Sequence, residues 1–294
     1  MSKSTHQLNK NTFKYLLIGS SGFLGSELKK ILPKKETFCV ARKNSDFNIN
    51  LQNINKLSKI FNSYNFKFAI NCAAKTSIEY CENKKIFCKK INTSLPIELD
   101  KLSKKNKFRL VHISTDQVYN SKSKKKNREF DQLGSSNYYS KTKLLAEKIL
   151  MKNQNNLIIR TNFTGITPSK KTFVSWLLES VLNKKKINLL SDMFVSTLDV
   201  KSCAKLINEL IKKNATGIFN LGTSDFLSKE QFAIYFAKKL NKNIYFNSIS
   251  VKDMPVARPK YLALDVSKIE KFLGKKMINS FTSIKRIIRE INKR

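Results

Sequence analysis

The sequence predicts an α/β fold, a mostly parallel sheet covered by helices on both faces. From Phe13 to Thr161, short apolar runs alternate with amphipathic stretches, which is the pattern of repeated strand and helix units. The strands are apolar on both faces, as in a parallel sheet that lies between two helical layers. With 294 residues and 41% hydrophobic content, the chain can form one large domain with a smaller partner.

The elements of the N-terminal half follow from these patterns. Short apolar runs predict strands, and longer amphipathic runs predict helices. We expect strands at 13–19, 37–41, 66–74, 108–115 and 156–161, and helices at 22–32 and 138–152. The polar segment 120–136 predicts a mobile surface loop.

The pattern loosens beyond Thr161. A helix is expected over 171–185, and the run 217–223 could return as a strand to the main sheet. Ser228 is a candidate N-cap with Gln231 three residues later, which is the spacing of a capping box. This half is too irregular to extend the sheet simply. We expect most of it to form a smaller, mixed α/β domain over the carboxyl edge of the strands, where such folds bind ligands.

A glycine-rich turn follows the first strand, in the run IGSSGFLGSEL. Gly19 would permit the tight turn, Gly22 would let the backbone approach a pyrophosphate, and Gly25 would allow close packing of helix on strand. The helix N-terminus would face the negative charge of the ligand. This context predicts a dinucleotide site, although a purely structural turn and a mononucleotide or flavin site remain alternatives. The residues expected to contact the cofactor here are Gly19, Ser21, Gly22, Phe23, Leu24 and Gly25.

The residues after the second strand bear on the choice of cofactor. An acidic residue there would bind the ribose hydroxyls of NAD, whereas Arg42 and Lys43 suit a 2′-phosphate. Arginine is rare in this lysine-rich chain, so Arg42 favours NADP(H), with NAD(H) as the alternative. Arg42 could also be an ordinary exposed cation.

The helix expected at 138–152 opens with two tyrosines. Tyr139 has Lys143 four positions later, which places the two side chains on one helical face. This spacing is weak on its own, because the chain holds nine tyrosines and a surplus of lysine. Two other pairs share it: Tyr80 with Lys84, and Tyr235 with Lys239.

The net charge of +36 would ordinarily suggest a nucleic acid or an anionic membrane as partner. Nearly all of the excess is lysine, spread along the chain beside abundant Asn and Ile, as an AT-rich genome would produce. A charge field that attracts anionic ligands remains an alternative. No RNP-type or helix-turn-helix pattern is found, so we expect no nucleic-acid partner.

Cysteine and histidine usage excludes several kinds of site. The five cysteines contain no C-x-x-C pair and are expected to be free thiols in a reducing compartment. The only histidines are His6 and His112, so a histidine-ligated metal site or a Ser-His-Asp triad is not expected. Residues 1–14 lack the apolar run of a signal peptide, and no stretch is long enough to span a membrane. These features predict a cytoplasmic protein.

Four ordered motifs over roughly half of the chain resemble those of the extended short-chain dehydrogenase/reductases, and most of all the dTDP-4-dehydrorhamnose reductases. They are the glycine turn, NCAAKTSIEYCE, ISTDQVY and YYSKTKLLAE. The resemblance implies a Rossmann-type doubly wound sheet. It also singles out Tyr139 with Lys143, because only this pair lies on the helix that follows the strand ending in Ser-Thr-Asp. The resemblance implies that Tyr139 is the catalytic acid, and that the Lys143 ammonium favours its phenolate form and binds the nicotinamide ribose.

By the same likeness, further residues correspond to functional positions of the family. Thr115 would be the hydroxyl member of the active site, and Asn92 would complete a proton relay. Asp46 and Phe47 resemble the pair that lies against the adenine, and Ala73 and Ala74 belong to the cofactor site.

The residues of the sugar pocket depart from the family pattern. Asp116 would orient the sugar or cap the following turn. Gln117 stands where the family commonly has an aromatic residue, and Phe163 where it often has tryptophan. The identity of the sugar is therefore left open. No acidic cluster matches a metal site, so none is expected.

The function implied by the resemblance is NADPH-dependent reduction of a 4-keto group on a nucleotide-activated deoxysugar, in dTDP-rhamnose or other surface polysaccharide biosynthesis. Alternatives are a sugar-nucleotide epimerase or dehydratase, and a non-catalytic NADP-binding regulatory subunit. A homodimer is left open. The expected domains are an NAD(P)-binding domain, 1–165 with 190–225 returning to it, and a substrate-binding domain, 166–189 with 226–294.

Overall fold

The computed structural model describes residues 11–51, 53–168 and 171–293 of the chain. His6 and most of the segment on which the signal-peptide prediction rests lie outside these residues. In the described part, no helix is both long enough and apolar enough to cross a membrane. All five cysteines are free thiols, as predicted, and four of them are buried.

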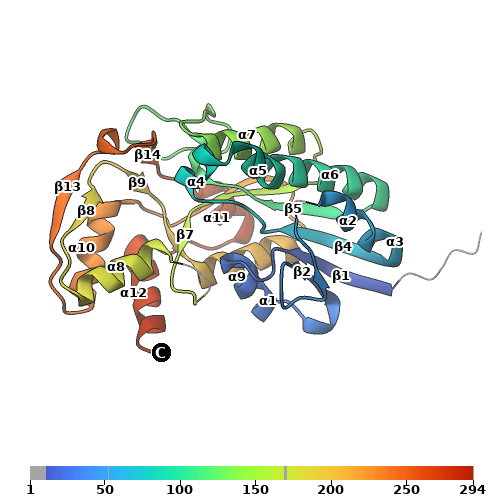
Figure 1. Cartoon of the computed structure of the whole chain (residues 1–294), viewed down its shortest axis with the longest axis horizontal. Coiled ribbons are helices and arrows are strands. Elements are labelled where there is room, and N and C mark those ends of the chain that lie inside the picture. The colour runs from blue at the N-terminus through green and yellow to red at the C-terminus, as the bar shows by residue number, and fades with distance from the viewer. Residues whose placement is uncertain (1–10, 52, 169–170, 294) are drawn as a thin grey trace, which may run out of the picture.

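A parallel sheet of seven strands forms the centre of the molecule (Figure 1). Its order is β11-β6-β5-β4-β1-β2-β3, and every neighbouring pair runs parallel. The strands are β1 (Asn11–Ile18), β2 (Thr37–Ala41), β3 (Phe47–Asn48), β4 (Tyr64–Asn71), β5 (Arg109–Ile113), β6 (Leu157–Thr161) and β11 (Gly217–Leu221). The predicted doubly wound, Rossmann-type fold is confirmed. Strand order reverses between β1 and β4, which is where such sheets bind ligands.

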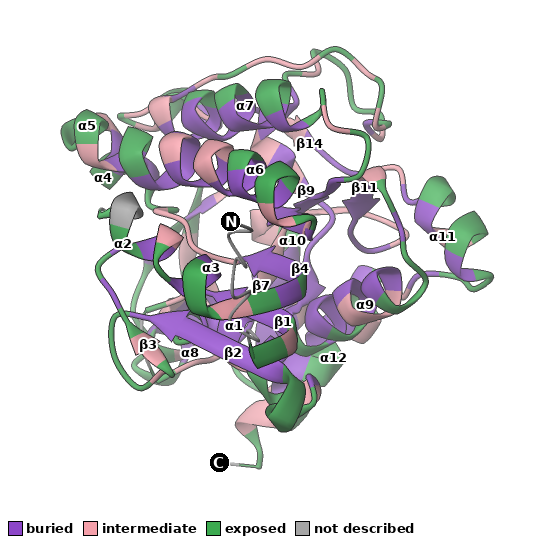
Figure 2. Cartoon of the chain, turned by 90° about the vertical axis from the view of Figure 1, so that its right-hand side faces the viewer, coloured by how far each residue is buried: buried purple, intermediate pink, exposed green. Residues whose placement is uncertain are grey.

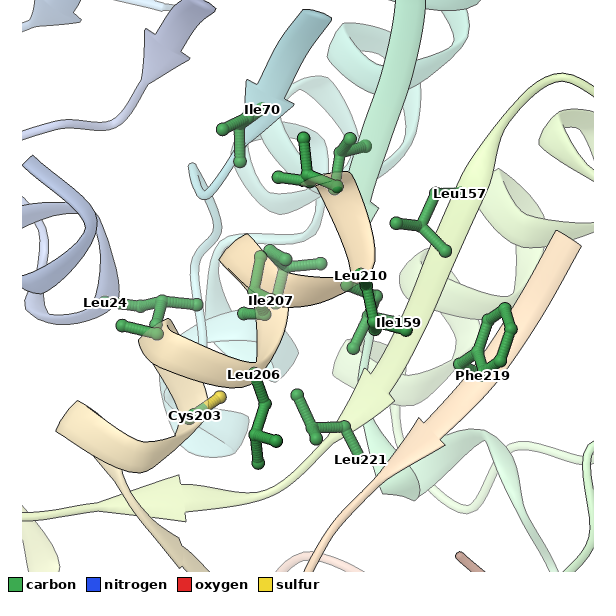
Figure 3. Packing of buried hydrophobic residues seen from close by; sticks show 14 of the residues in the cluster. Leu24, Ile70, Leu157, Ile159, Cys203, Leu206, Ile207, Leu210, Phe219 and Leu221 are labelled. Atoms are coloured by element: carbon green, nitrogen blue, oxygen red, sulfur yellow. The ribbon is translucent and has the colours of Figure 1, made fainter. Parts of the chain in front are cut away.

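Helices cover both faces of the sheet because its side chains alternate. In β1, Tyr15 and Leu17 enter one core cluster, whereas Leu16 and Ile18 enter the other. Figure 3 shows the first core, where α9 packs against β6 and β11, and Figure 2 shows the buried strands between the helical layers. The first face carries α1 (Phe23–Ile31), α9 (Val200–Lys212) and α11 (Ser267–Leu273). The second carries α2 (Ile54–Ser58), α3 (Ile60–Ser63), α6 (Leu95–Asn106) and part of α7 (Tyr138–Leu150).

The C-terminal half adds a smaller α/β layer at one end of the sheet (Figure 1). Its core is formed by α8 (Phe173–Leu182), β8 (Ile187–Leu190), α10 (Lys229–Lys239), β13 (Phe246–Ile249) and α12 (Ser280–Ile291). The short strands are β7 (Phe163–Thr164), β9 (Phe194–Val195), β10 (Leu198–Asp199), β12 (Leu227–Ser228) and β14 (Tyr261–Leu262). The predicted capping box of Ser228 and Gln231 is confirmed at the start of α10.

The segment 120–136 is not the simple surface loop that its polar sequence predicts. Asn127 is buried, and its side-chain amide donates to the carbonyl oxygens of Tyr261 (3.0 Å) and Ala263 (2.9 Å). The Glu129 carboxylate accepts a hydrogen bond from the backbone N–H of Asn220 in β11. Much of the segment is exposed, as a surface loop should be, but the buried Asn127 amide and the partly buried Glu129 carboxylate anchor it to remote parts of the chain.

Candidate active site

The glycine turn joins β1 to α1. Gly19 adopts a φ of +79°, the left-handed region in which glycine is least strained. A Cβ atom on Gly25 would lie 2.1 Å from the Gly19 carbonyl oxygen, so the helix can approach the turn only without one. A Cβ atom on Gly22 would have a single neighbour within 4 Å, the Gly19 carbonyl oxygen at 3.1 Å. The turn therefore leaves open space beside Gly22.

The N-terminus of α1 is available to an anion. Gly22 is its N-cap, and no side chain caps the helix, so its first N–H groups can bind phosphate oxygens. Ser21 and Gly22 are exposed, whereas the side chains of Phe23 and Leu24 lie in the core. Only the backbone of these last two residues can contribute to a ligand site.

The turn lies beside the end of β4, across the point where strand order reverses. A Cβ on Gly19 would be 2.9 Å from the Ala73 nitrogen, which shows how closely the two segments approach. The Ala73 N–H donates to Asn71 Oδ1 (3.1 Å). Ala73 and Ala74 are partly exposed, so this edge combines the glycine turn with the end of β4.

Arg42, Asp46 and Phe47 lie together at the end of β2. Arg42 is exposed, while the Asp46 carboxylate accepts a hydrogen bond from the backbone N–H of Cys39 (2.7 Å). Phe47 is half-buried against the second core. Asp46 thus fixes the turn after β2. Arg42 directly follows β2 at the edge of the sheet that also bears the glycine turn, where the Gly19 N–H donates to the Val40 carbonyl oxygen.

Tyr139, Thr115 and Asp116 converge where α7 begins beside the end of β5. Burial raises the pKa of Tyr139 above its ordinary value, while its hydrogen bond with Thr115 acts in the opposite direction and the Asp116 charge raises it further. Thr115 Oγ1 donates to Asp116 Oδ1 (3.1 Å). The Thr115 hydroxyl also accepts a hydrogen bond from the Gln117 backbone, so Thr115, not Asp116, caps the turn.

Lys143 lies one turn further along α7 and is buried. Its Nζ is 3.0 Å from His112 Nε2 and donates to the Ile113 carbonyl oxygen (2.7 Å). Burial lowers the pKa of Lys143 to about 8, although the nearby Glu147 charge raises it. The structure therefore brings Lys143 to the site but turns its amine toward β5.

Asn92 lies in a π-helical segment, Lys90–Ser94, between α5 (Lys85–Lys89) and α6. Its carboxamide accepts from the Lys75 N–H (2.9 Å) and donates to the Lys75 carbonyl oxygen (2.9 Å) and Thr142 Oγ1 (3.1 Å). These bonds occupy its side chain and fix the chain after β4 to α7. The proton-relay role of Asn92 stays a prediction.

Gln117 and Phe163 lie at different parts of the carboxyl edge of the sheet. Gln117 Oε1 is 3.4 Å from the side-chain nitrogen of Asn137, the N-cap of α7. The Phe163 ring lies 5.9 Å from that of Phe23, between the glycine turn and the C-terminal half. Gln117 is thus beside the N-terminus of α7, whereas Phe163 faces the start of α1.

Two cations from the C-terminal half reach this site and were missed by sequence reasoning. Burial lowers the pKa of Lys229 to about 8, while the charge of Asp116 opposes this shift and that of Arg258 adds to it. Arg258 forms an ion pair with Glu79 in α4 (Ile78–Asn83). Lysine is so abundant in this chain that the sequence distinguishes Lys229 by one feature alone, its position as the first residue of α10.

Replacing Asp116 by Asn is expected to stabilise the fold at neutral pH. Burial raises the pKa of Asp116 to about 6, so the folded protein binds this proton more tightly than the unfolded chain, where a carboxyl titrates at about 3.9. The charged carboxylate therefore costs stability above pH 6. Asp116→Asn should raise the free energy of unfolding by on the order of 1 to 3 kcal/mol at pH 7.5.

Urea unfolding at several pH values measures this effect. The advantage of Asp116→Asn should shrink as the pH falls from about 6 to about 4, where the unfolded-state carboxyl also becomes protonated. A gain that is the same at pH 4 and pH 7.5 would show that the buried charge is not its source.

The described residues contain no cluster of three or more His, Cys, Asp or Glu side chains with the arrangement of a metal site. A hollow of about 660 Å³ lies between α1, α9 and α12. None of the predicted site residues lines it. The candidate site is instead the edge where β1, β4 and β5 end beside α7.

Comparisons with known proteins agree on the family. The model of the RmlD substrate binding domain matches residues 13–293. A dTDP-4-dehydrorhamnose reductase from Aggregatibacter actinomycetemcomitans is 26% identical, with 89% of this chain and 93% of that protein covered. The probable low-salt glycan biosynthesis reductase Agl14 of Haloferax volcanii is 23% identical, over 87% of this chain and 91% of that protein.

The fold is shared with solved structures. The dTDP-4-dehydrorhamnose reductase of Bacillus anthracis, solved in complex with NADP, superposes with a TM-score of 0.85. It is 22% identical, and the match covers 96% of this chain and 99% of that one.

Proposed function

The chain belongs to the family of the RmlD substrate binding domain, and from that premise we propose that it is an NADPH-dependent reductase of a 4-keto group on a nucleotide-activated deoxysugar. The family assignment confirms the resemblance to dTDP-4-dehydrorhamnose reductases. One observation carries the proposal: Tyr139, Thr115 and Lys143 meet at the edge of the sheet that also bears the glycine turn.

The residues at this edge fit a dinucleotide cofactor. The open space at Gly22 and the uncapped N-terminus of α1 suit a pyrophosphate. Arg42 stands at the end of β2, where a 2′-phosphate distinguishes NADP from NAD. When bound, the reduced nicotinamide would supply the hydride for the keto carbon.

The chain's own residues would supply the proton and stabilise the charge on oxygen. Because burial raises the pKa of Tyr139, its hydroxyl stays protonated near neutral pH and can act as the general acid. The Thr115 hydroxyl can turn its one proton from Asp116 Oδ1 toward the same oxygen and donate a second hydrogen bond there as negative charge develops. Lys143 approaches from the β5 side, where it can bind a ribose hydroxyl.

The substrate would enter from the side of the C-terminal half. Asp116 can orient a sugar hydroxyl, and Gln117 lies beside it at the N-terminus of α7. Lys229 places a positive charge near this carboxylate, and Arg258 lies close to Lys229, a pair of cations that suits the diphosphate of a nucleotide sugar. On this basis the segments 166–189 and 226–294 form the substrate-binding part, and 1–165 together with 190–225 forms the cofactor-binding part. The reaction belongs in the cytoplasm.

The test is oxidation of NADPH by purified protein in the presence of nucleotide-linked 4-keto-deoxysugars, followed at 340 nm. Consumption of NADPH with a reduced sugar nucleotide as product would support the proposal. Tightly retained NAD and no net cofactor consumption would instead indicate an epimerase or dehydratase. NADPH binding without turnover, with a partner enzyme that co-purifies, would indicate a regulatory subunit.

Replacing Arg42 by Ala is expected to weaken NADPH binding about tenfold, the scale of one charge-assisted hydrogen bond, and to leave NADH binding nearly unchanged. The reason is that only NADPH carries the 2′-phosphate. Dissociation constants from nicotinamide fluorescence would measure both. Lys105→Ala, an exposed cation at the end of α6 and the other edge of the sheet, is the control. Equal losses for NADPH and NADH would argue against 2′-phosphate recognition.

A further inference from the structure

Lys143 is held by a chain of buried polar groups that the proposed reaction does not use. The Ala73 N–H donates to Asn71 Oδ1 (3.1 Å), and Asn71 Nδ2 lies 3.3 Å from His112 Nδ1. The other ring nitrogen, Nε2, is 3.0 Å from Lys143 Nζ. Asn71, His112 and Lys143 are each only 1% exposed, so water cannot substitute for a missing partner.

The hydrogen positions along this chain follow from its donors and acceptors. Because Asn71 Oδ1 accepts from Ala73, the amide presents its N–H groups to His112, and Nδ1 must be the acceptor. The proton of the neutral ring then lies on Nε2, which faces Lys143. An Nε2–H can donate only to a lone pair, and Nζ has one only as the neutral amine. That amine still donates to the Ile113 carbonyl oxygen (2.7 Å).

A charged Lys143 does not fit the same arrangement. An ammonium has three donors and no acceptor, so His112 Nε2 would have to give up its proton. The ring would then carry the proton on Nδ1, opposite the N–H groups of Asn71. Turning the Asn71 amide would relieve that clash but would set its N–H groups against the Ala73 N–H. One buried donor is left unpaired in either case, at a cost of about 1 to 3 kcal/mol.

We propose that Asn71 and His112 are positioning residues that hold Lys143 as the neutral amine in the cofactor-free protein. The inference deepens the proposed function, because it assigns a protonation state to a residue of the same site. It rests on that function only for its role in the reaction, since the donor and acceptor geometry stands without it. Binding of the cofactor would then be accompanied by uptake of a proton on Lys143 Nζ.

The surroundings of Lys143 agree with a readily lost proton. Burial lowers the pKa of Lys143 to about 8, which by itself still leaves the ammonium in the majority at neutral pH, so the neutral amine depends on the hydrogen-bond pattern of Asn71 and His112. Burial also lowers the pKa of His112 well below its ordinary value, so the ring itself stays uncharged. Glu147 on α7 favours the ammonium, but its carboxylate is bonded to Arg160. The Cys72 thiol at the end of β4 also faces Lys143, and burial raises the pKa of that thiol, so it stays uncharged.

The first test is an NMR titration of the cofactor-free, full-length protein. Protein labelled with 13C at lysine Cε, with Lys143→Met to assign the signal, reports the pKa of Lys143. We expect it below about 7, against the ordinary value of about 10.4, so that the neutral amine predominates at neutral pH. In Asn71→Leu the His112 ring can place its proton on Nδ1, so that Nε2 can accept a hydrogen bond from the Lys143 ammonium. In His112→Gln the side-chain carbonyl oxygen can accept that hydrogen bond. Both should raise the pKa of Lys143, and Cys72→Ala, in the same pocket, should leave it unchanged.

A second measurement needs no variant and covers the case in which a substitution prevents folding. With only two histidines in the chain, 15N NMR of the imidazole rings can identify the tautomer of His112. The proposal requires the proton on Nε2. A proton on Nδ1, an ordinary pKa for Lys143, or a low pKa that neither variant raises would each overturn it.

The third measurement is calorimetry of NADPH binding at pH 8.5 in two buffers of different ionisation enthalpy. Wild-type protein should take up a proton on binding, and His112→Gln should take up less. NADPH binding without proton uptake in the wild type would contradict the proposal. Absence of NADPH binding or of keto-sugar reduction, with the predicted NMR titration intact, would refute the proposed function and leave the inference on Lys143 standing.

Discussion

Replacing Tyr139 by Phe should lower kcat for keto-sugar reduction about 10²- to 10⁴-fold, the usual contribution of a general acid, and should leave NADPH affinity nearly unchanged. The substitution removes one hydroxyl from a buried ring and no charge. Its partner Thr115 keeps its bonds to Asp116 and to the Gln117 backbone, so the fold should hold. Steady-state kinetics and NADPH titration measure the two quantities separately.

The chain offers matched controls for this substitution. Tyr235 also has a lysine four residues later, and the Lys239 amine lies 5.6 Å from its ring centre. Tyr138 precedes Tyr139 but packs with its ring beside the Lys85 amine (5.7 Å). Tyr235→Phe and Tyr138→Phe should both retain near-normal kcat. If Tyr139→Phe retains more than about a tenth of wild-type kcat, Tyr139 is not the proton donor.

Much of the fold could be predicted because its signals are local. Residues 37–41 were expected as a strand and form β2 with those bounds, since five consecutive apolar or β-branched residues suit a strand buried on both faces. The capping box at Ser228 depends only on residues three apart. The glycine turn could be predicted for the same reason, because Gly22 and Gly25 both pack against the Gly19 carbonyl oxygen, only a few residues away in the chain.

The polar interior could not be predicted in the same way, because its contacts join distant residues. Lys143 was expected beside Tyr139, yet its amine bonds to His112, 31 positions away. The Ser-Thr-Asp strand end located the reactive groups but did not indicate the amide of Asn71, which fixes the histidine ring.

One signal of the polar interior was present in the sequence, because an arginine, rare in this chain, stands inside an apolar strand. Arg160 in β6 is such a residue, and it needs a buried partner.

Replacing Arg160 by Met should cost about 3 to 5 kcal/mol of unfolding free energy, because it leaves a buried carboxylate without its counter-charge. Arg160 and Glu147 are fully buried, and the guanidinium reaches Glu147 Oε2 through Nε (3.0 Å) and Nη2 (2.8 Å). Its Nη1 donates to the Tyr119 hydroxyl and the Glu129 carbonyl oxygen, both at 2.8 Å. Urea unfolding followed by circular dichroism measures the loss.

The double variant Arg160→Met with Glu147→Leu separates the unpaired charge from the lost packing. With both charges absent, part of the stability should return, because the largest cost of the single variant is the buried carboxylate. Recovery should stay incomplete, since the Tyr119 hydroxyl and the Glu129 carbonyl oxygen still lack their donor. The exposed pair Lys171 and Glu179, 3.1 Å apart, is the control, and Lys171→Met should change stability by less than about 1 kcal/mol. A double variant no more stable than Arg160→Met would mean that the guanidinium contributes through its bonds to the 119–129 segment and not through Glu147.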